Sequence, residues 1–61
     1  MLGIVLAMIR AQTSVAVVMS IIALLSKDSK NELLEQLQEL KISNGSNRDF
    51  IIYINDLMNE I

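Results

Sequence analysis

The feature that most constrains this chain is an apolar run from Leu2 to Leu25, which carries a single charged side chain, Arg10. A continuous helix of this length would be about 36 Å long, enough to cross a hydrocarbon core of about 30 Å. No proline interrupts the run. The sequence therefore predicts one long apolar N-terminal helix over residues 1–25, and its first interpretation is a transmembrane helix.

Polar residues inside the run make the membrane interpretation a close balance. On an insertion scale, the twelve Leu, Ile and Val residues of the run contribute about −5 kcal/mol together, whereas Arg10 costs about +2.5 to +3.5 kcal/mol. Gln12, Thr13, Ser14 and Ser20 add to that cost. A helix that is apolar all round is also expected in a protein core. The alternative is therefore a buried central helix of a soluble assembly.

Small side chains fall on one face of this predicted helix. At about 100° per residue, that face contains Gly3, Ala7, Arg10, Ala11 and Ser14. Small residues at four-residue spacing let two helices approach closely in a bilayer. Arg10 on this face would contact protein or water in place of lipid. We therefore predict that these five residues form a helix–helix packing surface.

Length and composition limit how the chain can be stabilised. It has 61 residues, one small domain at most, and a monomer of this size buries only about 60% of its unfolded surface. The absence of cysteine excludes disulfides and thiolate metal sites. The absence of histidine removes the commonest metal ligand and general base. Stability must then come from oligomerisation, a partner or a bilayer.

Charge is concentrated in the second half of the chain. The whole chain carries a net charge of −2, and Arg10 is the only charged side chain before residue 26, so the remainder carries −3. An acidic half argues against nucleic-acid binding and against a polybasic membrane-surface helix. Lys27 and Lys30 follow the apolar run directly. If the run crosses a membrane, they favour a cytoplasmic C-terminus.

Residues 26–30 are expected to form a polar break after the run. Ser29 and Glu32 match a capping box, which predicts a helix start near Asn31. The following segment, residues 31–42, has leucines at helical spacing on one side and carboxylates and amides on the other. It therefore predicts an amphipathic helix of about three turns. The leucines of its apolar face are Leu33, Leu37 and Leu40.

A loop and a second amphipathic helix complete the chain. Residues 43–47 read Ser-Asn-Gly-Ser-Asn, a composition typical of a helix–helix connection. A helix is predicted from Asp49 to Ile61, and its apolar face contains Phe50, Ile54, Leu57 and Ile61. Residues 31–61 are thus expected to form a helical hairpin. Its apolar face must pack on the first helix, on copies of itself or on a partner.

The functional expectations follow from this inventory. No nucleophile–base pair, metal-ligand cluster or nucleotide-binding motif is present. We therefore expect an all-α protein that is not an enzyme and takes no cofactor, metal or small-molecule substrate. The expected role is a single-span membrane protein that acts as a regulatory or accessory subunit, with itself or another protein as partner. The alternatives are a soluble cytoplasmic homo-oligomeric adaptor and a holin- or toxin-like membrane permeabiliser.

Overall fold

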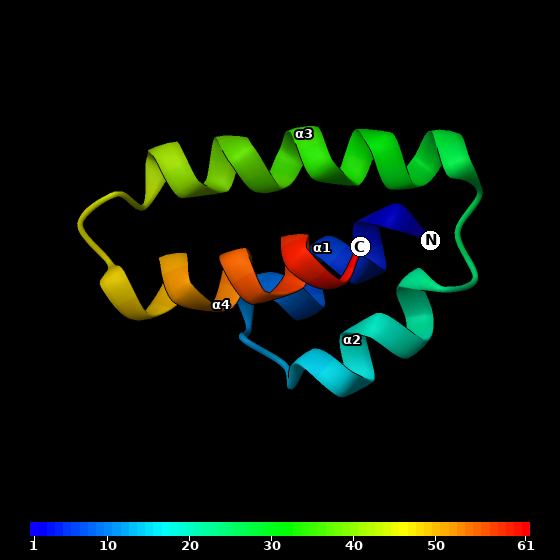
Figure 1. The fold of residues 1–61 in the computed structure, drawn as a ribbon, viewed down its shortest axis with the longest axis horizontal. Helices are drawn as coiled ribbons and strands as arrows, with labels where there is room; N and C mark the ends of the chain where they lie inside the picture. The colour runs from blue at the N-terminus through cyan, green and yellow to red at the C-terminus, as the bar shows by residue number, and fades with distance from the viewer.

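The computed structural model describes residues 1–61 and contains four α-helices and no β-strand. The all-α expectation is therefore confirmed, but the division of the N-terminal half differs from the expected one. The helices, shown in Figure 1, are α1 (Leu2–Arg10), α2 (Val15–Ile22), α3 (Lys27–Ser43) and α4 (Arg48–Glu60).

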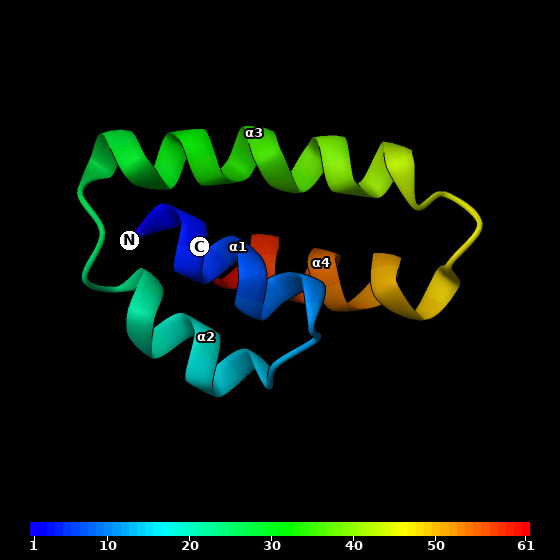
Figure 2. The same cartoon turned by 180° about the vertical axis from the view of Figure 1, so that it is seen from behind.

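The helices surround one core. α3 packs against α4 and α1, whereas α2 packs against α1 and α4. α3 and α2 therefore lie on opposite sides of the molecule, with α1 and α4 between them (Figures 1 and 2). α4 lies in front of α1 in Figure 1, and α1 lies in front of α4 in Figure 2, which shows the opposite side. The N-terminal half of the chain thus covers the apolar face of the α3–α4 hairpin.

Every helix enters the core through residues one turn apart. Residues at i and i+4 lie on the same face of a helix, so each helix presents one narrow apolar stripe inward. The core residues are Val5 and Ile9 in α1, Val18 and Ile22 in α2, Leu33 and Leu37 in α3, and Phe50, Ile54 and Leu57 in α4. No polar or charged residue is buried, and no buried side-chain N or O atom lacks a hydrogen bond.

The prediction of one long helix over residues 1–25 is wrong, because the chain leaves the helix after Arg10 and re-enters one at Val15. Gln12 has a φ of 56°, the only positive φ in the chain. The backbone N–H of Gln12 donates to the carbonyl of Ile9, and that of Thr13 to the carbonyl of Met8. These two bonds form a Schellman motif, in which the left-handed residue reverses the chain.

The physical reason for the break lies in the positions of the core residues. In a straight helix, the Val5–Ile9 pair and the Val18–Ile22 pair would point in directions about 140° apart around the axis. One straight helix therefore cannot bury both pairs against the α3–α4 hairpin. The turn at residues 11–14 folds α2 back beside α1, so that both pairs face the core. None of the four resulting helices has the length and apolar character needed to cross a membrane.

The predicted polar break at residues 26–30 is instead the start of α3. The N-cap is Ser26 in place of Ser29, and its Oγ accepts a hydrogen bond from the backbone N–H of Ser29 at 3.3 Å. Asp28 lies in the first turn, where a carboxylate is stabilised by the helix dipole. The sequence placed the N-cap three residues too late, at Ser29. Both serines precede a segment that can form a helix, so the sequence alone does not distinguish them.

Asparagines close both ends of the loop between α3 and α4. The Asn44 amide donates to the carbonyl of Leu40 at 2.9 Å, a second hydrogen bond to the carbonyl that also accepts from the Asn44 backbone N–H. The Asn47 Oδ1 accepts from the backbone N–H of Phe50 at 3.2 Å, which caps α4. These bonds set the antiparallel geometry of the hairpin and place Phe50 in the core.

Substitution of a core isoleucine tests this packing. We expect Ile9→Ala, at a fully buried site, to lower the free energy of unfolding by about 2–5 kcal/mol, because it leaves a cavity. The same substitution at Ile42, which is 82% exposed, should change it by less than about 0.5 kcal/mol. Urea denaturation followed by circular dichroism measures both values. Equal losses at the two sites would contradict the assignment of Ile9 to the core.

Candidate functional site

The outer sides of α1 and α2 form the least charged surface of the protein. Arg10 is the only charged side chain before residue 26, and it lies at the end of α1. In Figure 2, α1 faces the viewer and α2 lies beside it. We define the neutral surface as the exposed residues Met1, Gly3, Ile4, Ala7, Ala11, Ala16, Val17, Ala23 and Leu24.

The rest of the molecule has the opposite character. All seven carboxylates are exposed and belong to α3 and α4. They are Asp28, Glu32, Glu35, Glu39, Asp49, Asp56 and Glu60. The protein is therefore two-sided, with a side formed by the N-terminal helices whose one charged side chain is Arg10, and an acidic side formed by the C-terminal hairpin.

The five residues predicted to pack helices together are all exposed. Gly3, Ala7 and Arg10 lie on α1, whereas Ala11 and Ser14 lie in the turn that follows it. A Cβ added at Gly3 would meet no atom within 4 Å. The fold thus makes no internal use of this face, and the helical spacing that defined it ends at the turn. A packing role for it stays a prediction.

The predicted partner face of the hairpin is covered by the chain itself. Five of its residues are buried in the core, namely Leu33, Leu37, Phe50, Ile54 and Leu57. Leu40 and Ile61 are half-buried and pack against that core. The helices that cover this face are α1 and α2, so in this structure the face is not open to a separate partner.

Tyr53 ties α4 to the turn between α1 and α2. Its hydroxyl donates to the backbone carbonyl of Thr13 at 2.5 Å. Burial raises the pKa of Tyr53 above its usual value of 10.0. The ring also stacks on Phe50, with ring centroids 6.3 Å apart. Sequence reasoning missed this residue. The available signal was that a tyrosine packed on a core usually finds a hydrogen-bond partner for its hydroxyl.

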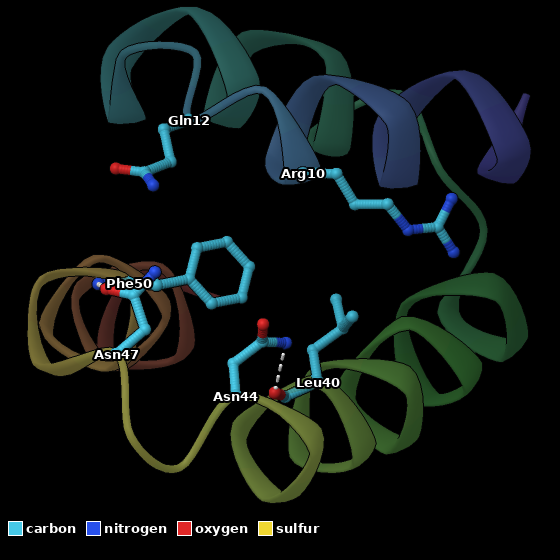
Figure 3. Close-up of a pocket in the computed structure, with 6 residues that line it drawn as sticks. All are labelled: Arg10, Gln12, Leu40, Asn44, Asn47 and Phe50. Atoms are coloured by element: carbon cyan, nitrogen blue, oxygen red, sulfur yellow. Dashed lines mark hydrogen bonds between the residues drawn. The ribbon is translucent and has the colours of Figure 1, made fainter.

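A groove of about 350 Å³ opens between the end of α1 and the α3–α4 loop (Figure 3). Its lining joins one guanidinium and three side-chain amides with two apolar residues, and it contains no carboxylate. The lining residues are Arg10, Gln12, Leu40, Asn44, Asn47 and Phe50. In Figure 3 the Phe50 ring lies between Gln12 and Asn44, and the guanidinium makes no drawn hydrogen bond.

The groove offers both hydrogen-bond donors and acceptors. The Arg10 guanidinium donates and suits carbonyl or carboxylate oxygens, whereas each side-chain amide both donates and accepts. Asn44 and Asn47 each form one side-chain hydrogen bond with the backbone of a helix end, which fixes the orientation of their amides. No three His, Cys, Asp or Glu side chains come together as a metal site. The groove therefore supplies polar contacts beside the neutral surface, since Arg10 adjoins both.

Comparison with protein-family models, with curated proteins and with solved structures finds no match for this chain. The functional interpretation therefore depends on surface chemistry and geometry. The neutral surface departs from an ordinary polar exterior, and the groove beside it offers polar side chains.

The Tyr53 hydrogen bond has a measurable pH signature. Because the folded-state pKa is raised, the unfolded chain loses the phenol proton first, at a pH of about 10. The contribution of Tyr53 to the free energy of unfolding is therefore complete below pH 10 and decreases as pH rises through the folded-state pKa. Thermal unfolding between pH 8 and 11 should show a steeper loss for the wild type than for Tyr53→Phe.

Every other titratable group is common to both proteins, so the difference between the two curves isolates the phenol. At neutral pH, Tyr53→Phe should be less stable by about 0.5–1.5 kcal/mol, the net value of one hydrogen bond. Parallel pH curves for the two proteins would refute the assigned contact.

Proposed function

We propose that this protein is a small homo-oligomeric interaction module that assembles through its neutral surface. The observation that carries the proposal is the exposure of large apolar side chains on an almost uncharged side of a small protein. Ile4 is 64% exposed and Leu24 is 72% exposed. Exposed apolar patches mark interaction sites, and stable homodimer interfaces are depleted of charge at their centre.

The size of the neutral side suits an interface. A standard interface covers about 800 Å² on each partner, which is roughly a fifth of the 3940 Å² accessible surface of this protein. The nine exposed residues of the neutral surface would lie within such an area. A monomer of 61 residues with nine buried side chains also gains stability when association covers further apolar area.

Charge favours a second copy as the occupant. In a twofold-symmetric dimer the same patch meets itself, so a neutral surface needs no complementary charge across the interface. The seven carboxylates lie on α3 and α4 and would stay on the outside of such a dimer. Anionic lipid or nucleic acid would instead meet a protein of net charge −2 whose N-terminal helices carry one basic side chain, Arg10.

The small residues of α1 fit this role. Gly3 and Ala7 are exposed one turn apart, and such residues let two helices approach closely. Arg10 and the amides of the groove would lie at the edge of the contact, where interfaces carry their polar groups. The acidic outer sides of α3 and α4 would remain free, which suits an adaptor that presents two or more copies of one surface to other proteins.

A matched pair of charge substitutions tests the proposal. Ile4→Glu places a carboxylate in the neutral surface, whereas Ile52→Glu places one on α4 at a site of similar exposure, 53%. We expect Ile4→Glu to weaken assembly by at least about tenfold, because a buried unpaired carboxylate is costly. Ile52→Glu should leave assembly unchanged. Sedimentation velocity over a concentration series measures both, and a wild type that stays monomeric at high concentration would overturn the proposal.

Close helix packing makes a separate prediction. Ala7→Leu should weaken assembly, because the larger side chain keeps the facing helices apart. If the surface were merely adhesive, the added apolar area would strengthen association. Gln38→Leu, at an exposed site on α3, serves as the control for added apolar area. A tighter dimer in the Ala7→Leu protein would contradict close contact at α1.

A further inference from the structure

We propose that residues 2–25 have a second state, in which they form one straight helix inserted in a lipid bilayer, and that the turn at residues 11–14 holds this state back. The inference concerns a different partner, neutral lipid, and does not rest on the proposed self-assembly. It is carried by the turn, by the single tertiary hydrogen bond that reaches it, and by the positions of the apolar pairs on either side.

The local sequence of the turn does not require a break. Ala11, Gln12, Thr13 and Ser14 include neither proline nor glycine, and each can continue a helix. Gln12 occupies the left-handed position of the Schellman motif, where glycine is strongly preferred because a Cβ is disfavoured there. The break is therefore maintained by the surrounding fold against a local preference for helix.

One side chain from another helix reaches the turn. The Tyr53 hydroxyl donates to the Thr13 carbonyl across 40 positions of sequence. All other side-chain hydrogen bonds in the protein join residues three or four positions apart. Tyr53 thus forms the only side-chain hydrogen bond between the turn and the rest of the fold, and we call this bond the latch. It adds to the core packing of α1 and α2.

Lipid removes the reason for the turn. In the folded protein the turn is needed because Val5 and Val18 would point about 140° apart around a straight helix while only one core exists. In a bilayer every side of a helix contacts an apolar solvent, so both sides are satisfied at once. A straight helix over the 24 residues from Leu2 to Leu25 would be about 36 Å long, against a hydrocarbon core of about 30 Å.

The hydroxyls and the guanidinium of the segment can be accommodated, whereas Gln12 adds to the cost of insertion. The Ser20 hydroxyl already donates to the Val17 carbonyl within its helix at 2.6 Å, and the Thr13 and Ser14 hydroxyls can bond in the same way in a continuous helix. Arg10 would lie about 12 Å along the axis from Leu2, so its long side chain can extend toward the near interface.

Labels at two positions report the state directly, because the chain has no native cysteine. Gly3→Cys and Ala23→Cys add spin labels at exposed sites. In the folded protein the start of α1 and the end of α2 lie at the same end of the molecule (Figures 1 and 2). In a straight helix, the two Cα atoms would be about 30 Å apart.

The experiment adds phosphatidylcholine vesicles at pH 7 to labelled protein diluted with an excess of unlabelled protein, so that only distances within one chain are seen. Vesicles are separated by flotation, and the distance distribution is measured by double electron–electron resonance. We expect the floated protein to show a narrow population near the straight-helix distance. The proposal is overturned if no protein floats, or if the floated protein keeps the short distance.

Two substitutions with opposite expected effects test the latch. Tyr53→Phe removes the donor to Thr13 and should raise the straight-helix fraction by about three- to tenfold. Gln12→Gly relieves the left-handed position and should lower that fraction several-fold. If Tyr53→Phe merely loosened the fold, the distances would broaden without a population near 30 Å, which would overturn the latch. Sedimentation of the Ile4→Glu protein tests self-assembly, whereas flotation and the distance between labels test insertion. The two proposals can therefore fail separately.

Discussion

The fold depends on the reversal at residues 11–14, because the apolar residues on either side of it would otherwise point away from each other. Val5 and Ile9 enter the core from α1, and Val18 and Ile22 enter it from α2, yet a straight helix would separate these pairs by about 140°. The Schellman motif at Gln12 makes the two stripes face one core. It also leaves the small and apolar residues of the same helices on the outside, which creates the neutral surface.

The α3–α4 hairpin could be predicted from the sequence because charge marks its outer side. Carboxylates and amides alternate with leucines at helical spacing, so Leu33 and Leu37 were recognisable as inward-facing, as were Phe50, Ile54 and Leu57 in α4. In residues 2–25 almost no charge distinguishes the outer from the inner side. The turn there contains no glycine or proline. The break therefore results from tertiary packing, which overrides a helix-compatible local sequence.

Part of the candidate site could likewise be predicted from the sequence, and part could not. Exposure of Gly3 and Ala7 agrees with the face that helical spacing defined, because both residues precede the turn and keep their spacing. Ala11 and Ser14 fall outside that helix, so the predicted face is shortened. Tyr53 could not be identified, because its partner, the Thr13 carbonyl, is 40 residues away and is a backbone acceptor that any sequence contains. The groove at Arg10 was equally hidden, since it brings together the turn and the α3–α4 loop.

A chain that buries only nine of 61 residues leaves apolar side chains that a second molecule or a bilayer can cover. In the proposed assembly Ile4 and Leu24 contact another copy, and in the proposed inserted helix they contact lipid. The same side chains cannot do both, so the two processes are linked. A ligand shifts an equilibrium only toward the state that it binds, so assembly stabilises the broken helix and opposes insertion, and lipid draws the protein out of its assembly by mass action. The turn at Gln12 would then decide which surface the N-terminal half presents, and protein concentration relative to lipid would set the balance.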